Sequence, residues 1–299
     1  LKTGSEATQA AVRAACAFTH RDGIAFRGYH GWHSWYAISS ERPKGIPKEY
    51  ANYIYPFEYN DIKTLHAVLN QHEIAAVIME PTIIQAPKPG FLAEVKELVH
   101  SKGALLIFDE VVTGFRFPGL SAQHYFDVVP DIATFGKGMA NGMPLSAVVG
   151  RRDVMNEFEE IFVSSTFGGE CLSLAAAKAT ITEMMGTPVV AHIWGMGQRL
   201  LDGLHQIGFS TVGYPCRPLI LLPNETPALR SLLMQETAKK GILVHGGAMN
   251  LCYSHNQEDI DITLKALSEV YGILQYAMKN DRVEAMLEGQ IIQPAFRRF

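Results

Sequence analysis

A carboxylate and a lysine stand at the ends of two apolar, strand-like segments. Residues 104–108 lead to Asp109, and residues 132–135 lead to Lys137, which has a glycine on either side. A lysine that can form a Schiff base, with an acid held near it on the same sheet edge, is what pyridoxal phosphate chemistry requires. Taken alone, a strand-terminal Asp and a loop Lys are more often a solvated turn and a surface charge. Its meaning therefore depends on what the rest of the chain places around it.

Four further segments have residues that suit a phosphorylated aromatic cofactor, and each has an ordinary structural alternative. Thr3-Gly4-Ser5 opens a helix, where free N–H groups and hydroxyls bind phosphate or simply cap the helix. Tyr29 follows a strand and offers either a stacking face or a core side chain. Val111 shares the side of Asp109 if the strand alternation continues, and could pack on a ring or in the core. Residues 164–169 are hydroxyl- and glycine-rich, which is typical of an anion site or a turn.

The elements around the Asp109 strand predict an α/β fold. An apolar strand at 75–79 is followed by an amphipathic helix at 91–102 and by the strand at 104–109. A strand, helix and strand with short connections form a βαβ unit, so the two strands should be parallel. Their carboxyl ends then share one edge, where ligands bind in open α/β sheets, and Glu80 and Asp109 both lie there. We expect a mostly parallel sheet with helices on both faces.

The remaining pattern predicts two domains, a large one at 1–186 and a smaller α+β domain at 187–299. Ser5 is the expected cap of the first helix, which runs to Thr19. Residues 39–60 are rich in Pro, Gly and Tyr and predict an irregular segment. Other expected strands are 24–26, 146–149, 218–222 and 242–245, and other expected helices are 61–71, 171–185, 188–206, 227–240 and 258–279.

The composition argues against several classes of protein. A net charge of −4 gives no broad basic surface for nucleic acid or an anionic membrane. No apolar run approaches the ~20 residues that span a bilayer. The four cysteines are far apart and the eleven histidines lack metal-ligand spacing. We expect a cytoplasmic protein with reduced thiols, no metal, and a small-molecule substrate.

In their order along the chain, these segments resemble the class III, fold type I aminotransferases that use pyridoxal phosphate. The likeness is greatest to the glutamate-1-semialdehyde 2,1-aminomutase group. It covers essentially the whole chain, and the block from Asp109 to Lys137 is its most specific part. The motifs that carry it are Thr3-Gly4-Ser5-Glu6-Ala7, Tyr29-His30-Gly31-Trp32-His33, Met79-Glu80-Pro81, Asp109-Glu110-Val111-Val112-Thr113-Gly114-Phe115-Arg116, Gly136-Lys137 and Ser165-Thr166-Phe167-Gly168-Gly169.

The resemblance implies catalytic roles for three residues. Lys137 would form the Schiff base with pyridoxal 5′-phosphate and then shuttle a proton. Asp109 would pair with the pyridine nitrogen and keep it protonated. Glu80 would lie near the 3-hydroxyl side of the ring or near the substrate amine.

The resemblance also implies which residues bind the cofactor and how the chain assembles. Gly4 and Ser5 would bind its phosphate and Tyr29 would stack on its ring. Thr166 would reach the phosphate of a neighbouring subunit, which makes a homodimer the expected active unit. The full set of implied cofactor-binding residues is Gly4, Ser5, Tyr29, His30, Asp109, Val111, Lys137 and Thr166.

Two departures from the family pattern bear on function. The family's N-terminal region is missing upstream of Leu1, so we expect the chain to be an incomplete piece of a full enzyme rather than half of a split protein. Glu170 stands where many relatives have Asn, which favours a subgroup whose substrate is left open. The sequence predicts an aminotransferase that moves an amino group between a donor and a carbonyl substrate. The alternatives are an intramolecular aminomutase of the glutamate-1-semialdehyde type and a non-catalytic truncated remnant.

Overall fold

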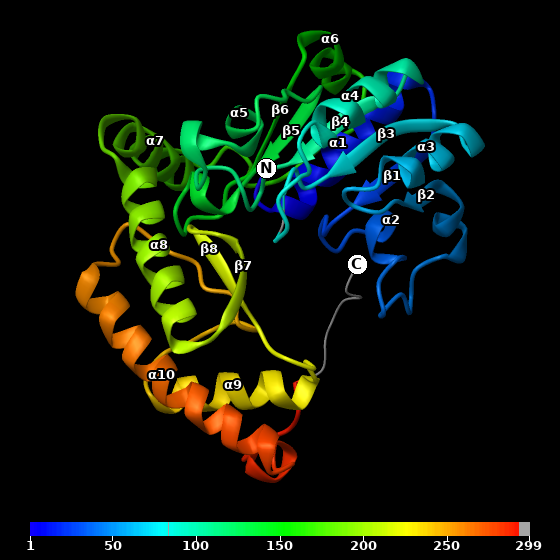
Figure 1. Cartoon of the computed structure of the whole chain (residues 1–299). Coiled ribbons are helices and arrows are strands. Elements are labelled where there is room, and N and C mark those ends of the chain that lie inside the picture. The colour runs from blue at the N-terminus through cyan, green and yellow to red at the C-terminus, as the bar shows by residue number, and fades with distance from the viewer. Residues whose placement is uncertain (83, 293–299) are drawn as a thin grey trace. The chain divides into compact units, whose positions relative to one another are not determined.

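The computed structural model describes residues 1–82 and 84–292, which divide into two compact units (Figure 1). The first unit spans residues 1–187 and the second begins at Pro188. Within these described residues, no helix is both long enough and apolar enough to cross a membrane. The two units are described separately below.

The first unit is built on a six-stranded sheet in the order β2-β1-β3-β4-β5-β6. Neighbouring strands are parallel from β2 to β5, and only the edge strand β6 is antiparallel. The expected mostly parallel α/β sheet is therefore confirmed. The strands are β1 (Gly23–Arg27), β2 (Ile54–Pro56), β3 (Ile74–Met79), β4 (Leu105–Asp109), β5 (Ile132–Phe135) and β6 (Ala147–Gly150).

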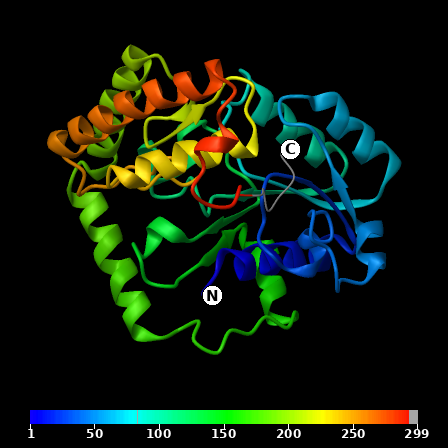
Figure 2. The ribbon, with the colours of Figure 1, turned by 90° about the horizontal axis from the view of Figure 1, so that it is seen from below.

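Helices cover both faces of this sheet. The longer ones are α1 (Gly4–Thr19), α3 (Ile62–Gln71), α4 (Phe91–Ser101) and α7 (Cys171–Gly186). Short helices are α2 (Ser34–Ala37), α5 (Ala122–Tyr125) and α6 (Arg152–Met155), with 3-10 turns at Lys48–Tyr53, Pro118–Leu120, Lys137–Met139 and Asn156–Glu159. Helix α1 packs on β3 to β6, whereas α3 and α4 pack on the opposite face (Figures 1 and 2).

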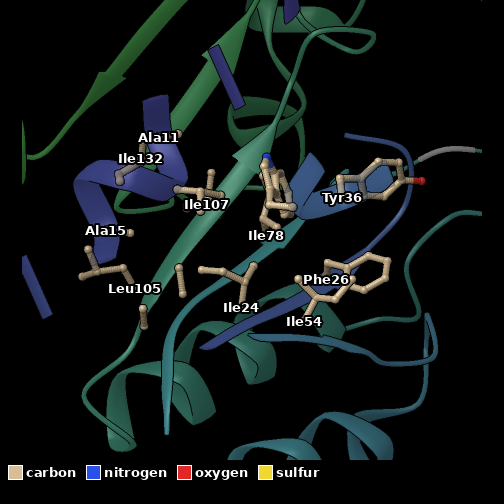
Figure 3. Close-up of a cluster of buried hydrophobic side chains, with 14 of the residues drawn as sticks. Ala11, Ala15, Ile24, Phe26, Tyr36, Ile54, Ile78, Leu105, Ile107 and Ile132 are labelled. Carbon is tan, nitrogen blue, oxygen red and sulfur yellow. The ribbon is translucent and has the colours of Figure 1, made fainter. Parts of the chain in front are cut away.

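Side-chain alternation along the central strands separates two apolar cores. In β4, Leu105 and Ile107 face α1, and Leu106 and Phe108 face α3 and α4. Figure 3 shows the first core, where Ala11 and Ala15 of α1 lie among side chains of the strands. All four of these β4 side chains are at most 3% exposed. A strand buried on both faces needs a continuous apolar run, which is why 104–108 could be recognised in the sequence.

The beginning of α1 differs from the expectation. Thr3, not Ser5, is the N-cap: its Oγ1 accepts the N–H of Glu6 at 3.1 Å. The Glu6 carboxylate in turn accepts the N–H of Thr3 at 2.9 Å, which completes a capping box. Glu6 three residues after Thr3 is the sequence signal for this arrangement. Ser5 is thus inside the first turn.

Three strand predictions were wrong. Residues 54–56, expected to be irregular, form β2 because they pair with β1. Residues 242–245, expected to be a strand, form only a bridge between His245 and Ala248. Gly246 and Gly247 both have positive φ there and turn the chain back on itself. Strand β7 (Ser210–Tyr214) was not predicted, because only its pairing with β8 stabilises so polar a segment.

The second unit has a two-stranded antiparallel sheet and three long helices. Helix α10 packs against both α8 and α9, and α8 also contacts the two strands. The elements are α8 (Val189–Ile207), β7 (Ser210–Tyr214), β8 (Arg217–Leu221), α9 (Pro227–Lys239), α10 (Gln257–Lys279) and a 3-10 turn at Glu284–Met286.

Candidate active site

The parallel register brings the predicted chemical residues to one edge of the large sheet. Arg27 is paired with Met79, and Asp109 with Thr134. Tyr29 and Glu80 therefore leave β1 and β3 at the same edge where β4 ends at Asp109. Lys137 follows three positions after Thr134. This is the carboxyl edge of the parallel strands, as the sequence predicted.

Asp109 is held by several hydrogen bonds. Its side chain is buried, with 4% of the residue exposed. Oδ1 accepts the N–H of Val111 at 3.1 Å and the hydroxyl of Thr134 at 3.2 Å. Oδ2 lies 2.8 Å from Nδ1 of His30. Three contacts from three segments fix the carboxylate in one orientation.

The buried side chain of His30 contacts the carboxylate of Asp109. The imidazole is fully buried, stacks on Trp35 and makes an edge contact with Tyr36. Its Nε2 lies 3.2 Å from the carbonyl of Arg27, so both ring nitrogens have a partner. The resemblance had suggested only cofactor binding for His30. Its contact with Asp109 had no sequence signal, because 79 positions separate the two residues.

Tyr29 and Glu80 are joined through the backbone. Glu80 is buried, and its Oε1 accepts the N–H of Tyr29 at 2.9 Å. The ring of Tyr29 is 45% exposed and meets Tyr36 edge-on, with the ring centroids 5.6 Å apart. Burial of its inner part and the charge of Asp109 raise the pKa of Tyr29. Tyr29 is therefore not a core side chain, and its exposed part can contact a ligand.

The first turn of α1 has the properties of a phosphate cradle. Glu6 accepts the N–H groups of Lys2 and Thr3, and Thr3 accepts that of Glu6. Burial raises the pKa of Glu6, but those two backbone N–H groups lower it, and the net shift is downward. Among the described residues, the N–H groups of Gly4 and Ser5 have no acceptor. Two adjacent open N–H groups at a helix N-terminus suit an anion.

Val111 joins this cradle to the lysine loop. β4 ends at Asp109, so Val111 lies in a turn and not on the strand face that period-two alternation implied. A Cβ on Gly4 would come within 2.8 Å of its Cγ1, and one on Gly136 within 3.4 Å. Val111 thus contacts the residue that opens α1 and the residue before Lys137. Gly4 has to be glycine because this contact leaves no room for a side chain.

Lys137 begins a single 3-10 turn directly after β5 and Gly136. Its φ is +41°, in the left-handed region that a lysine seldom adopts. Non-glycine residues in this region cost of order 1 kcal/mol and cluster at functional sites. The side chain is exposed at the carboxyl edge.

Thr166 lies on segment 163–170, which precedes α7, and its side chain is exposed. The segment ends at Glu170, which caps α7 by accepting the N–H groups of Leu172 and Ser173. The sequence pattern indicated no role for Glu170 beyond a departure from the family pattern. A glutamate directly before an apolar helix was the available signal for the cap.

The residues present fit pyridoxal phosphate. Open N–H groups at Gly4 and Ser5 would hold a phosphate, the face of Tyr29 an aromatic ring, and the buried Asp109 a ring N–H. Lys137 offers a primary amine at the same edge. In contrast, the described residues contain no group of three His, Cys, Asp or Glu side chains that could hold a metal.

Comparisons with known proteins point to one family. The family model for aminotransferase class-III matches residues 1–214. A 3-aminobutyryl-CoA aminotransferase from Cloacimonas acidaminovorans is 34% identical over 290 residues, covering 90% of this chain and 69% of the relative. A glutamate-1-semialdehyde 2,1-aminomutase from Alkaliphilus oremlandii is also 34% identical, covering 90% and 72%.

Solved structures agree with this result. The pyridoxal phosphate internal aldimine form of the FumI protein of Sphingopyxis sp. MTA144 superposes with a TM-score of 0.88 at 25% identity, covering 93% of this chain and 71% of FumI. An ornithine aminotransferase from Toxoplasma gondii has the same fold, with a TM-score of 0.81 at 24% identity. The chain belongs to the class III aminotransferase family of pyridoxal phosphate-dependent enzymes.

Proposed function

We propose that this protein transfers an amino group between an amino donor and a carbonyl substrate, with Lys137 and Asp109 at the centre of its site. The observation that carries the proposal is the buried contact between Asp109 and His30, at the same sheet edge as Lys137. A surface aspartate in a turn needs no such support. The alternative of a non-catalytic remnant is disfavoured because the supporting residues are present as well as the two central ones.

Each residue of the site has a distinct task in this proposal. When bound, pyridoxal phosphate supplies an aldehyde that condenses with amines and a ring that accepts a carbanion's electron pair. Lys137 provides the amine and, at Nζ, carries a proton to and from the reacting carbon. Asp109 holds a proton on the ring nitrogen. Gly4 and Ser5 bind the phosphate, and Tyr29 covers one ring face.

We further propose that the active unit is a homodimer in which Thr166 serves the partner's site. Helix α7 is largely apolar but scarcely buried, and Phe167 in the segment before it is exposed as well. Phe167, Leu172 and Met185 are 68%, 72% and 77% exposed, and only Ser173 and Ala177 of the helix are buried. Exposed apolar surface of this kind is typical of a protein interface. A second copy of this chain would cover it and receive Thr166.

The test of the proposed activity is a half-reaction. Protein loaded with pyridoxal phosphate is mixed with a panel of amino donors, and the keto product is measured per subunit. About one equivalent of product without added keto acid supports transfer between molecules, and continued turnover after a keto acid is added completes it. Absence of product from every donor, with cofactor bound, would contradict the proposal.

An intramolecular aminomutase is the second candidate, favoured by the similarity to glutamate-1-semialdehyde 2,1-aminomutases. The two activities differ in where the nitrogen goes. Protein loaded with the pyridoxamine form and given an excess of glutamate-1-semialdehyde labelled with ¹⁵N should return the label within 5-aminolevulinate over repeated turnovers, with no added donor, if it is a mutase. Release of the diamine 4,5-diaminovalerate, with turnover that requires an external amino donor to regenerate the pyridoxamine form, would indicate a transferase.

A further inference from the structure

Lys2 joins two parts of the site that are far apart in the sequence. It stands two residues before Gly4, and its Nζ lies 2.6 Å from Oε1 of Glu170 and 3.2 Å from Oγ of Ser173. The lysine and glutamate side chains are 15% and 28% exposed, so the pair is largely shielded from water. Ion pairs shielded in this way are screened less by salt than surface pairs. The pair thus connects the cradle end of α1 to the first turn of α7.

The charge on Glu170 is secured by the same contacts. The hydrogen bond from Lys2 and the bonds from Ser173 lower the pKa of Glu170 to about 2. Glu170 is therefore ionised at neutral pH. It can hold Lys2 and cap α7 at the same time.

Helix α1 also holds the other end of the segment that precedes α7. Nη1 of Arg13 donates to the carbonyl of Phe162 at 2.5 Å. Arg13 of α1 and Lys2, which lies just before this helix, therefore contact the two ends of the segment at residues 162 and 170, while the intervening Thr166 and Phe167 remain exposed. A segment anchored at both ends loses much of its conformational freedom before any ligand or partner arrives.

We propose that Lys2 and Glu170 are positioning residues that hold segment 163–169 in register with the phosphate cradle of α1. The inference rests on the proposed function, because segment 163–169 includes Thr166 and the cradle includes Gly4 and Ser5. Lys2 acts through Glu170 and contacts the segment only at its end. Loss of either charge frees the segment and leaves the other charge poorly compensated beside the cradle. The phosphate end of the cofactor should be affected and its ring end should not.

A double-mutant cycle tests the pair. The variants are Lys2→Met, Glu170→Gln, the double variant, and Lys2→Arg, which retains the charge. Two quantities are measured for each: the dissociation constants of pyridoxal phosphate and of pyridoxal, and hydrogen exchange of the amides in 163–170. The matched control is Lys240→Met with Glu269→Gln, which removes a lysine–glutamate ion pair in the second unit.

The expected result is a phosphate-specific loss. Lys2→Met and Glu170→Gln should each weaken pyridoxal phosphate binding by roughly tenfold and speed exchange in 163–170. The double variant should bind pyridoxal phosphate no more weakly than the weaker-binding of the two single variants. Lys2→Arg should bind it as wild type does. The affinity for pyridoxal should not change in these variants. The control variants should have the same affinities and the same hydrogen exchange as wild type.

If wild type binds the cofactor normally, either of two results would overturn the inference. One is unchanged affinity and exchange in Lys2→Met. The other is a double variant whose loss is the product of the two single losses, because the two residues would then act independently. Failure of wild type to bind pyridoxal phosphate is a different outcome, since it would contradict the proposed function itself.

Discussion

At the scale of single residues, the site depends on how firmly Asp109 is held. Asp109→Asn keeps the shape but cannot hold a proton on the ring nitrogen as a carboxylate does. We expect cofactor binding to persist and kcat/KM to fall by about a hundredfold or more. Single-turnover rates and cofactor titrations measure the two effects separately. A variant with near wild-type kcat/KM would show that Asp109 does not have this role.

Thr134→Val provides a graded comparison for Asp109→Asn. It removes one hydrogen bond from a neutral hydroxyl to the carboxylate oxygen Oδ1 and keeps the buried shape. A hydrogen bond to a charged group contributes at least about 1.5 kcal/mol, so a loss of roughly tenfold is expected. A loss as large as that of Asp109→Asn would mean that Thr134 has a role of its own.

Some residues of the site could be predicted from the sequence, whereas the contacts between them could not. Asp109 and Lys137 were found because each follows a buried apolar strand. The link between His30 and Asp109 was not, because it depends on how β1 and β4 lie across the sheet. The contact of Val111 with Gly4 was missed for a related reason. Its expected direction assumed a strand that in fact ends two residues earlier.

At the scale of elements, the cradle depends on the close approach of α1 and the turn after β4. Gly4→Ala would place a Cβ 2.8 Å from Cγ1 of Val111, so one of the two segments has to move. Overpacking of this kind costs about 1–3 kcal/mol of unfolding free energy. We expect a lower melting temperature and weaker cofactor binding. Both should recover in the double variant Gly4→Ala/Val111→Ala.

Gly195→Ala is the control for this prediction. Gly195 lies in α8, and no atom would lie within 4 Å of an added Cβ. Gly195→Ala should leave cofactor binding unchanged and raise the free energy of unfolding by about 1 kcal/mol or less. If Gly4→Ala behaved in the same way, the close approach would not matter.

A second element-scale prediction concerns the opposite edge of the sheet. The buried Asp131 accepts the N–H of Leu106 and contacts His100 and Arg151, each at 2.8 Å. Burial raises the pKa of Asp131. Its three partners together lower the pKa by a larger amount, so the net shift is downward. Its stabilisation is therefore complete above the ordinary aspartate pKa and is lost as the pH falls through the lowered folded value.

Asp131→Asn should then reduce the free energy of unfolding by about 3 kcal/mol at neutral pH, because it leaves buried partners unsatisfied. The difference in free energy of unfolding between wild type and Asp131→Asn should be smaller in acid, because wild type loses the same charge there. Denaturant unfolding between neutral pH and pH ~3 measures both. Asp153→Asn, on the exposed side of Arg151, should leave the midpoint unchanged. Equal effects of the two substitutions would contradict this explanation.

Elements with continuous apolar patterns were the predictable ones. Strands β3 and β4 could be recognised because both sheet faces are buried, and helix α4 because one of its faces packs on the sheet. β2 and β7 could not, since their strand conformation depends on a pairing partner. The turn at Gly246-Gly247 prevented the strand expected before it.

At the scale of the whole molecule, the homodimer proposal predicts complementation between two impaired variants. Lys137→Ala should be inactive and Thr166→Ala impaired. In a mixed dimer, one site has Lys137 from one chain and Thr166 from the other. Random mixing should therefore restore about a quarter of wild-type activity. If Thr166 serves the site of its own chain, mixing restores nothing beyond the residual activity of Thr166→Ala.

We propose above that Lys137 is the residue that bonds to pyridoxal phosphate. Borohydride reduction of the cofactor-loaded protein, followed by peptide mass spectrometry, identifies that residue directly. We expect one pyridoxyl group per chain, on Lys137, and none in Lys137→Ala. A pyridoxyl group on another lysine, such as Lys2 beside the cradle, or no stable adduct in wild type, would contradict it.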